Sequence, residues 1–221
     1  IQWGASTEIV MSNGVVKNAT DPDNLQFDFP TVQASTTRTD LINFVKEEDL
    51  SIRLPEKIQL KGRLEGTVDA ISTDIKVTTS QGIASVKGMF ENKKELAFNA
   101  NINIQEYRLD KLLQNEKLGP ISLTINGKGS GTKINTLDAD LTATISSFQL
   151  NEYAIKDLEI NGAIKNGKGT VKSTYKDENL NMNLEAFVVA DSIAPEANIN
   201  MNIIGIGDLK AVHGKCKIGD N

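Results

Sequence analysis

An alternation of apolar and polar residues dominates the chain and is cleanest between Leu96 and Gln105. The residues between the apolar positions are small or polar. Successive side chains of a strand point to opposite faces, so this period of two predicts a strand with one apolar face and one polar face. The apolar positions of this stretch are Leu96, Phe98, Ala100, Ile102 and Ile104.

A short helical pattern interrupts the alternation. From Arg108 to Leu113 the apolar residues have helical spacing over about one and a half turns, which predicts a short helix near Leu109–Gln114. Gly119 and Pro120 end it, because proline cannot continue a helix and glycine frees the turn. A second alternating strand follows over 121–125. The unit is therefore strand, short helix and strand.

The same alternation recurs over 54–203, with short turns between the rows. Strands joined in this way predict an all-β, mostly antiparallel meander. A phase slip at Ser146 and Ser147 predicts a β-bulge. The apolar rows supply the candidate groove residues, which are Leu60, Leu64, Val77, Val86, Leu96, Phe98, Ile102, Ile104, Leu123, Ile125, Leu141, Ile145, Ile160, Met182, Leu184, Ile199, Met201 and Ile203.

The two ends of the chain give weaker patterns. The run 12–14, Ser-Asn-Gly, predicts a hairpin between 8–11 and 15–16. Thr39 and Asp40 predict a short helix through Val45, although a strand fits nearly as well. The residues from His213 to the end are polar, and we expect them to fray.

Composition leaves two architectures open. The 221 residues are 39% hydrophobic and only 5% aromatic, which is little for a thick two-sided core. The ordinary structural interpretation is a closed β-sandwich, in which the apolar faces of two sheets pack against each other. The alternative is a single curled sheet whose inner face stays partly open. An open trough of aliphatic side chains without convergent charges suits acyl chains better than sugars or peptides.

Charge and motifs argue against catalysis and nucleic-acid binding. The net charge is −5 with both signs mixed, so there is no basic footprint for nucleic acid. His213 and Cys216 are the only histidine and cysteine, which excludes an internal disulfide and a zinc cluster of these ligands. The glycines of 127–131 lack phosphate-loop spacing, and the acids of 47–49 fit a solvated loop. We expect no enzyme activity and no cofactor.

No stretch reaches the ~20 apolar residues of a membrane helix, and no signal peptide is visible. The chain begins at Ile1 rather than methionine. We interpret it as a segment of a longer or processed protein.

From about Leu54 to Ala211 the chain resembles the C-terminal half of TamB proteins of the AsmA-like superfamily, in particular those of Bacteroidetes. The most specific phrase is the run from a strand through LDKLL and LG to a strand ending in GxG. The resemblance rests on LPEKIQLKGRLEGTVDAI, TTSQGIASVKG, INIQEYRLDKLLQNEKLGPISLTINGKGSGT, YAIKDLEINGAIKNGKGTVKS and IIGIGDLKA.

The resemblance implies an elongated, curled sheet, often called a β-taco, with an apolar concave groove. The expected organisation is an N-terminal β segment (1–53), the TamB-like β-taco (54–211) and a polar tail (212–221). It further implies phospholipid transport in the periplasm, within a protein anchored in the inner membrane by a helix absent from this chain. An outer-membrane β-barrel protein of the Omp85 type is an implied partner. The alternatives are a scaffold for assembly of outer-membrane barrels, acting through free sheet edges, and a closed sandwich. The open edges also leave room for a dimer.

Overall fold

The computed structural model describes residues 2–43, 52–93, 95–131, 133–151, 153–178, 180–190, 196–205 and 212–218. The helices are η1 (Pro22–Asn24), α1 (Arg38–Leu41), α3 (Leu109–Leu112) and η2 (Ile134–Thr136). The strands are β1 (Gln2–Trp3), β2 (Thr7–Ser12), β3 (Val15–Lys17), β4 (Gln26–Thr37), β5 (Lys57–Thr67), β6 (Ala70–Thr79), β7 (Gly82–Asn92), β8 (Leu96–Arg108), β9 (Leu118–Ser130), β10 (Asp138–Leu150), β11 (Tyr153–Ile155), β12 (Leu158–Lys165), β13 (Lys168–Lys176), β14 (Leu180–Val189), β15 (Glu196–Gly205) and β16 (Val212–Ile218).

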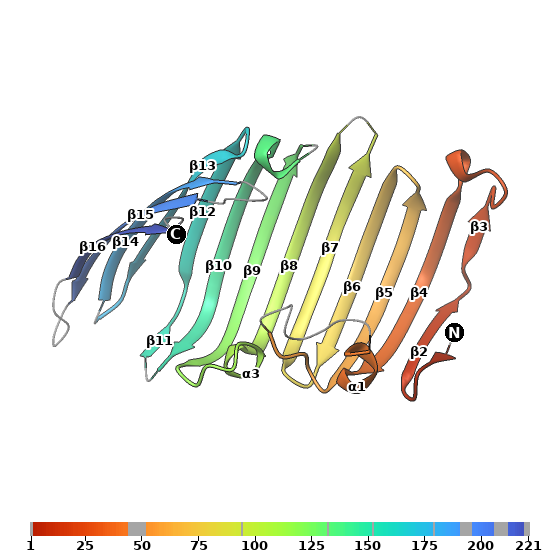
Figure 1. Cartoon of the computed structure of the whole chain (residues 1–221), viewed down its shortest axis with the longest axis horizontal. Coiled ribbons are helices and arrows are strands. Elements are labelled where there is room, and N and C mark those ends of the chain that lie inside the picture. Colours follow the sequence, from red (N-terminus) through yellow and green to blue (C-terminus); the bar gives the residue numbers. More distant parts are fainter. Residues whose placement is uncertain are drawn as a thin grey trace.

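All the strands belong to one antiparallel sheet, and their spatial order follows the chain. The path runs β1-β2-β4-β5-β6-β7-β8-β9-β10-β12-β13-β14-β15-β16, with β3 on β4 and β11 on β10. The sheet is not closed, since β1 and β16 lie at opposite ends of the path. The predicted all-β antiparallel meander is therefore confirmed. Figure 1 shows the strands side by side, with α1 and α3 at the same end of the strands and the last strands turned relative to the rest.

The sheet is a single layer, so the alternative of a closed sandwich is wrong. The chain exposes 14715 Å², whereas a compact monomer of 24.0 kDa would expose about 9,900 Å². Among the described residues only four apolar side chains are buried, and none of them is less than 2% exposed. The four are Ile121, Leu158, Tyr175 and Ala186. The residues of this part of the chain therefore hold their shape by strand pairing rather than by a packed core.

Bulges in β8 and β10 keep the apolar residues of these two strands on one face. The predicted slip in β10 is confirmed, because the register with β9 shifts between Ile145 and Ser147. Another shift lies in β8, between Ile104 and Tyr107, where Glu106 has a φ of 50°. A bulge moves the following residues to the opposite phase. Tyr107 therefore pairs with Ile121, although its odd number breaks the even-numbered apolar row of β8.

The predicted short helix is present as α3 (Leu109–Leu112). The amide of Leu113 donates to the carbonyl of Leu109 at 2.9 Å, which completes its one turn. The amide of Arg53 donates to the carbonyl of Leu112 at 2.8 Å, so the segment before β5 is tied to α3. This end of the sheet is thereby covered by local structure.

The predicted hairpin at 12–14 is wrong. β2 and β3 do not pair with each other; they lie one after the other along the same neighbour, β4. Asn13 has a φ of 56°, a left-handed conformation that asparagine tolerates, and it kinks the edge strand without reversing it. A side chain at Gly14 would collide with the ring of Phe29, since its Cβ would lie 2.3 Å from Phe29 Cδ1.

The expectation of a frayed tail is also wrong for 212–218, which form β16. β16 pairs with β15 over seven residues, from Val212 opposite Ile203 to Ile218 opposite Ala197. The alternation of apolar and polar residues in this run matches the register of β15, which explains why a polar sequence still forms a strand.

A buried carboxylate fastens the first turn of the chain to α1. Asp40 is 4% exposed. Its carboxylate accepts hydrogen bonds from the Ser6 amide and hydroxyl and from the Thr7 hydroxyl, each at 2.9 Å, and from the Ala5 amide at 3.3 Å. The bond from the Ser6 amide is the main cause that lowers the pKa of Asp40 from 3.8 to about 2, although burial acts in the opposite direction. The expected helix is confirmed over 38–41, whereas Phe44 and Val45 lie outside the described residues.

We expect the hydrogen bonds between this first turn and the carboxylate of Asp40 to be lost only in strong acid. Because the folded pKa of Asp40 is depressed, its stabilising effect is fully present above pH 3.8 and disappears as pH falls through about 2. An NMR titration of the Ser6 amide should therefore have its midpoint near 2, and Asp40→Asn should abolish that transition. A midpoint at 3.8 in the wild-type chain would contradict this assignment.

Candidate functional site

The apolar rows converge on one continuous face. Paired residues of neighbouring strands present their side chains on the same side of a sheet, so the register shows which positions share the face. One row crosses the sheet from β4 to β15 without a break. It consists of Val32, Gly62, Ile75, Val86, Ile102, Ile125, Ala143, Ile160, Ser173, Leu184 and Met201.

The register places the backbone positions of all eighteen candidate groove residues on this same side, which we call the apolar face. Leu60 pairs with Val77, and Ile104 pairs with Leu123, which in turn pairs with Ile145. Leu64, Leu141 and Ile199 lie on a further row, through their pairing with Thr73, Gly127 and Ala186. Met182 pairs with Tyr175 and with Ile203 of β15, whose side chain is not among those described.

The candidate set omits most of an aromatic group toward the ends of β4, β7 and β8 that lie away from α1 and α3. Phe90 pairs with Phe98 across β7 and β8. Phe27 and Phe29 stack with their ring centroids 5.9 Å apart on β4. The sequence contains a signal for these residues, since each phenylalanine has a polar neighbour on at least one side. Only the pairing of β4 with β5, however, shows that Phe27 and Phe29 lie on the apolar face.

The apolar face carries no charge among the described residues. Charged residues make up 24% of the chain. Apart from Asn92 at the end of β7, every inward position of the ladders of β4–β10 and β12–β15 is nonetheless apolar, glycine, serine, threonine or tyrosine. A charge at such a position would have to be desolvated wherever the face is covered. The face is thus suited to an uncharged, apolar occupant.

Three hydroxyl groups on this face bond to the protein's own backbone. Ser173 Oγ donates to the carbonyl of Glu159 at 2.7 Å, and Thr79 Oγ1 donates to the carbonyl of Gly82 at 2.9 Å. Thr73 Oγ1 donates to the carbonyl of Arg63 at 3.3 Å. A hydroxyl that is already paired costs little when covered by a non-polar group. These residues therefore behave as part of the apolar wall.

Tyr175 places its ring on the apolar face and its hydroxyl at the rim. That hydroxyl donates to Asp177 Oδ2 at 2.8 Å, and the hydroxyl of Tyr153 bonds to the same carboxylate oxygen. Burial is the main cause that raises the pKa of both tyrosines, and the hydrogen bond to Asp177 acts in the same direction. Both phenols therefore stay neutral over the physiological pH range.

The opposite face is mostly polar, and cross-strand pairs connect several of its side chains. Asn101 Nδ2 donates to Asn126 Oδ1 at 2.7 Å, and Lys172 Nζ lies 3.0 Å from Glu185 Oε1. Exposed pairs of this kind contribute little stability individually. They are typical of a hydrated outer surface, so the other side of the same strands is the candidate binding surface.

The apolar face is open over a large area. Most of its described side chains are half-buried, and Leu96 and Leu141 are 47% and 40% exposed, although Ile121, Leu158, Tyr175 and Ala186 on the same face are buried. Ten neighbouring strands, β5–β10 and β12–β15, span roughly 33 by 48 Å, or about 1,600 Å². The largest apolar patch of a typical monomer is about 300–600 Å². Such an area points to an occupant that covers it.

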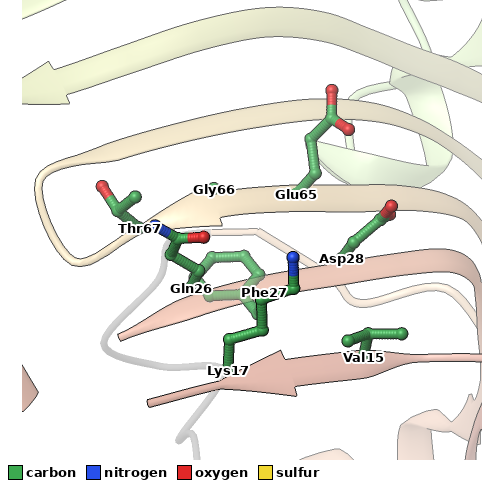
Figure 2. A pocket seen from close by; sticks show the side chains of 8 residues that line it. All are labelled: Val15, Lys17, Gln26, Phe27, Asp28, Glu65, Gly66 and Thr67. Atoms are coloured by element: carbon green, nitrogen blue, oxygen red, sulfur yellow. The ribbon is translucent and has the colours of Figure 1, made fainter. Parts of the chain in front are cut away.

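A hollow of about 420 Å³ lies where β3, β4 and β5 meet, and most of the residues that line it belong to the polar face. Figure 2 shows the side chains of Lys17, Asp28 and Glu65 rising from these three strands. Neither this hollow nor any other place among the described residues has a group of three or more potential metal ligands. The described helices are all too short and polar to cross a membrane. This hollow offers no chemistry comparable to the apolar face.

Two further runs, 127–131 and 47–49, were expected to have no phosphate-binding or catalytic role. Residues 127–130 form the end of β9, as expected of a curled strand end. The acids of 47–49 lie outside the described residues. Comparison with known proteins adds no relative: no family model, no curated protein and no solved structure matches the chain.

Proposed function

We propose that this chain is a lipid-carrying segment of a periplasmic bridge between the inner and outer membranes. Acyl chains lie against the apolar face while headgroups stay in water. The observation that carries the proposal is the open face that crosses ten strands, on which the described residues place neither a charge nor a second layer of protein. The resemblance to TamB proteins supports phospholipid as the ligand.

The mechanism is passive sliding along the rows. Each methylene removed from water contributes ~0.8 kcal/mol. The row from Val86 through Ile102 and Ile125 presents similar aliphatic groups at each strand spacing. Successive positions of an acyl chain are therefore close in energy, and none of the residues in this row is charged. The direction of net movement would come from outside this segment.

The membrane context of the proposal rests on the same resemblance. The segment would belong to a protein anchored in the inner membrane and would deliver phospholipid toward an outer-membrane barrel partner of the Omp85 type. The rival role, a scaffold for outer-membrane barrel assembly, would use the free edges of the sheet instead of its face. Photocrosslinkers on the polar face of edge strands and on central apolar positions would separate the two roles.

The direct test is organic extraction of the purified chain followed by mass spectrometry. We expect co-purified phospholipid at about one molecule or more per chain, because an acyl chain of ~15 Å covers only part of the face. Native mass spectrometry should show the corresponding adducts. A lipid-free chain that also fails to take up phospholipid from vesicles would overturn the proposal.

A further inference from the structure

Another hollow lies at the end of the sheet that carries α1 and α3 (Figure 1). Its volume is about 590 Å³, within the range of about 300–1,000 Å³ that is usual for small-molecule sites. Three segments surround it, namely the chain just before β5, the turn between β6 and β7, and α3 with the residues that follow it. We call it the α3 hollow, and the charged or unpaired side chains that line it are Arg53, Glu56, Gln81, Asp110, Lys111 and Glu116.

Hydrogen bonds between the three segments hold the α3 hollow in shape. The amide of Glu56 donates to Ser80 Oγ at 3.1 Å, which ties the chain before β5 to the turn. The amide of Arg108 donates to the carbonyl of Gln81 at 2.8 Å, and the amide of Arg53 donates to the last residue of α3. These bonds use backbone groups and one hydroxyl, so the charged ends of the lining side chains remain available.

One cation and one anion of the α3 hollow lack a close partner of their own. Arg108 donates to both carboxylate oxygens of Asp110, at 2.8 and 2.6 Å, so this carboxylate is already neutralised. Lys111 Nζ lies 3.8 Å from the same carboxylate, and its side chain is 64% exposed. Glu116 has no ion pair among the described residues. Lys111 and Glu116 can therefore each turn toward a charged ligand.

Arg53 and Glu56 add a further cation and a further anion. Arg53 Nη2 lies 3.6 Å from Glu56 Oε1, which is longer than the 2.7–2.9 Å of a strong charge-assisted hydrogen bond. Their side chains are 48% and 63% exposed. An exposed pair of this kind contributes little stability. A ligand that binds one of the two groups therefore gives up little when the pair opens.

Gln81 contributes an unsatisfied acceptor. Its Oε1 atom is buried and has no hydrogen-bond partner among the described residues. An acceptor that is buried without a partner is costly. A turn of this side chain toward the α3 hollow would offer the oxygen to a donor there, so the hollow favours a ligand that carries N–H or O–H groups.

The α3 hollow adjoins the apolar face. Thr79 and Gly82 flank the turn between β6 and β7, pair with each other, and lie on that face. The ring of Tyr107 lies close by, since a Cβ on Gly82 would be 2.9 Å from Tyr107 Cδ2. A lipid with its acyl chains on the apolar face at β6–β8 would therefore have its headgroup within reach of the hollow.

We propose that the α3 hollow binds the phosphoethanolamine headgroup of a phospholipid, an inference that rests on the lipid-carrying function proposed for this chain. The phosphate binds to Lys111 and Arg53. The primary ammonium donates to Glu116, Glu56 and the amide oxygen of Gln81. Two cations and two anions match a headgroup that has one phosphate and one ammonium. A phosphoglycerol headgroup leaves both carboxylates unmatched, and a choline has no N–H group to donate.

Vesicles with equal parts of phosphatidylethanolamine, phosphatidylglycerol and phosphatidylcholine, all with the same acyl chains, test this preference. Extraction and mass spectrometry give the composition of the lipid that the chain takes up. We expect the ethanolamine lipid to be enriched about three- to fivefold, as partly exposed charges allow. Glu116→Gln with Glu56→Gln should bring the enrichment close to one and leave the total lipid unchanged.

The matched control removes the same kinds of charge elsewhere. Lys172 and Glu185 form an ion pair of 3.0 Å on the polar face of β13 and β14. Lys172→Gln with Glu185→Gln should keep the preference of the wild-type chain. Equal loss of preference in this control would overturn the assignment to the α3 hollow. Uptake of all three lipids in equal amounts by the wild-type chain would overturn the inference and leave the lipid-carrying function standing.

A soluble headgroup tests the α3 hollow without any acyl chain. Glycerophosphoethanolamine should shift the NMR signals of the Gln81 and Lys111 amides, and it should bind more tightly than glycerophosphoglycerol. Lys111→Gln should weaken this binding about two- to fivefold. Failure to take up lipid from any vesicle would count against the lipid-carrying function alone, because the titration examines the hollow by itself. Unshifted amides at high concentrations of glycerophosphoethanolamine would overturn the headgroup site.

Discussion

Ile102→Asp together with Leu141→Asp should reduce phospholipid loading at least about 10-fold, because each carboxylate would have to be buried beneath an acyl chain. The two residues lie on β8 and β10, in neighbouring rows of the apolar face. The fold should survive, since Leu141 is 40% exposed and neither residue belongs to the buried core of the described part of the chain. Extraction and mass spectrometry give the lipid content, and circular dichroism gives the strand content.

The matched control places the same two charges on the other side of the same strands. Asn99 and Thr142 are exposed and lie on the polar face of β8 and β10. Asn99→Asp with Thr142→Asp should load as much lipid as the wild-type chain. Equal loss in both double variants would show an effect of net charge or folding, and unchanged loading in the first would count against the apolar face as the lipid site.

Gly169→Ala should lower the free energy of unfolding by about 1–3 kcal/mol, the usual cost of forcing an atom into filled space. A Cβ at this position would lie 1.9 Å from the carbonyl oxygen of Ala163 and 2.7 Å from Ile164 Cα. Both are backbone atoms of β12, which cannot move aside like a flexible side chain. Equilibrium urea unfolding measures the change.

Gly162→Ala is the companion substitution, on the same apolar face but in open space. Its nearest neighbour would be Val171 Cγ2 at 3.5 Å, an ordinary contact. Alanine restricts the unfolded chain more than glycine does, so stability should rise by about 0.5–1 kcal/mol. Equal changes in the free energy of unfolding for the two substitutions would contradict the prediction. The close approach of β12 to β13 would then not explain the requirement for glycine at position 169.

The strand content of this fold could be predicted from sequence because alternation is a local property. Leu96 to Ile104 shows the period of two without any knowledge of its neighbours. The number of layers could not be predicted in this way. A strand of a sandwich and a strand of a single sheet have the same alternation, and only the pairing of β4 through β16 in one path separates the two.

The errors at the N-terminus have a similar cause. Ser12, Asn13 and Gly14 match a hairpin turn locally, but β2 and β3 both find their partner in β4, which lies further along the chain. Alternation alone does not reveal the bulge at Glu106, because one polar residue in an extra position looks like the end of a strand. Tyr107 is the available signal, since it restores an apolar residue in the shifted phase.

The candidate groove was predictable in its aliphatic part and incomplete in its aromatic part. Leu, Ile, Val and Met in clean rows identify the face, and the register places them together. Phe27 and Phe90 lie in one row of the same face, and this row is connected through Gly66 of β5 and Ile71 of β6. A glycine between two apolar residues carries no hydrophobic signal, so the continuity of such a row is visible only in the paired sheet.

Strand order that follows chain order has a consequence for how such a protein can change in size. Each hairpin is held only by the strand before it and the strand after it, much as a unit in a repeat array depends on its neighbours. Inserting or deleting one hairpin would lengthen or shorten the sheet by about 10 Å and would require no adjustment elsewhere. The distance that this architecture can span is therefore set by the number of hairpins that its gene encodes.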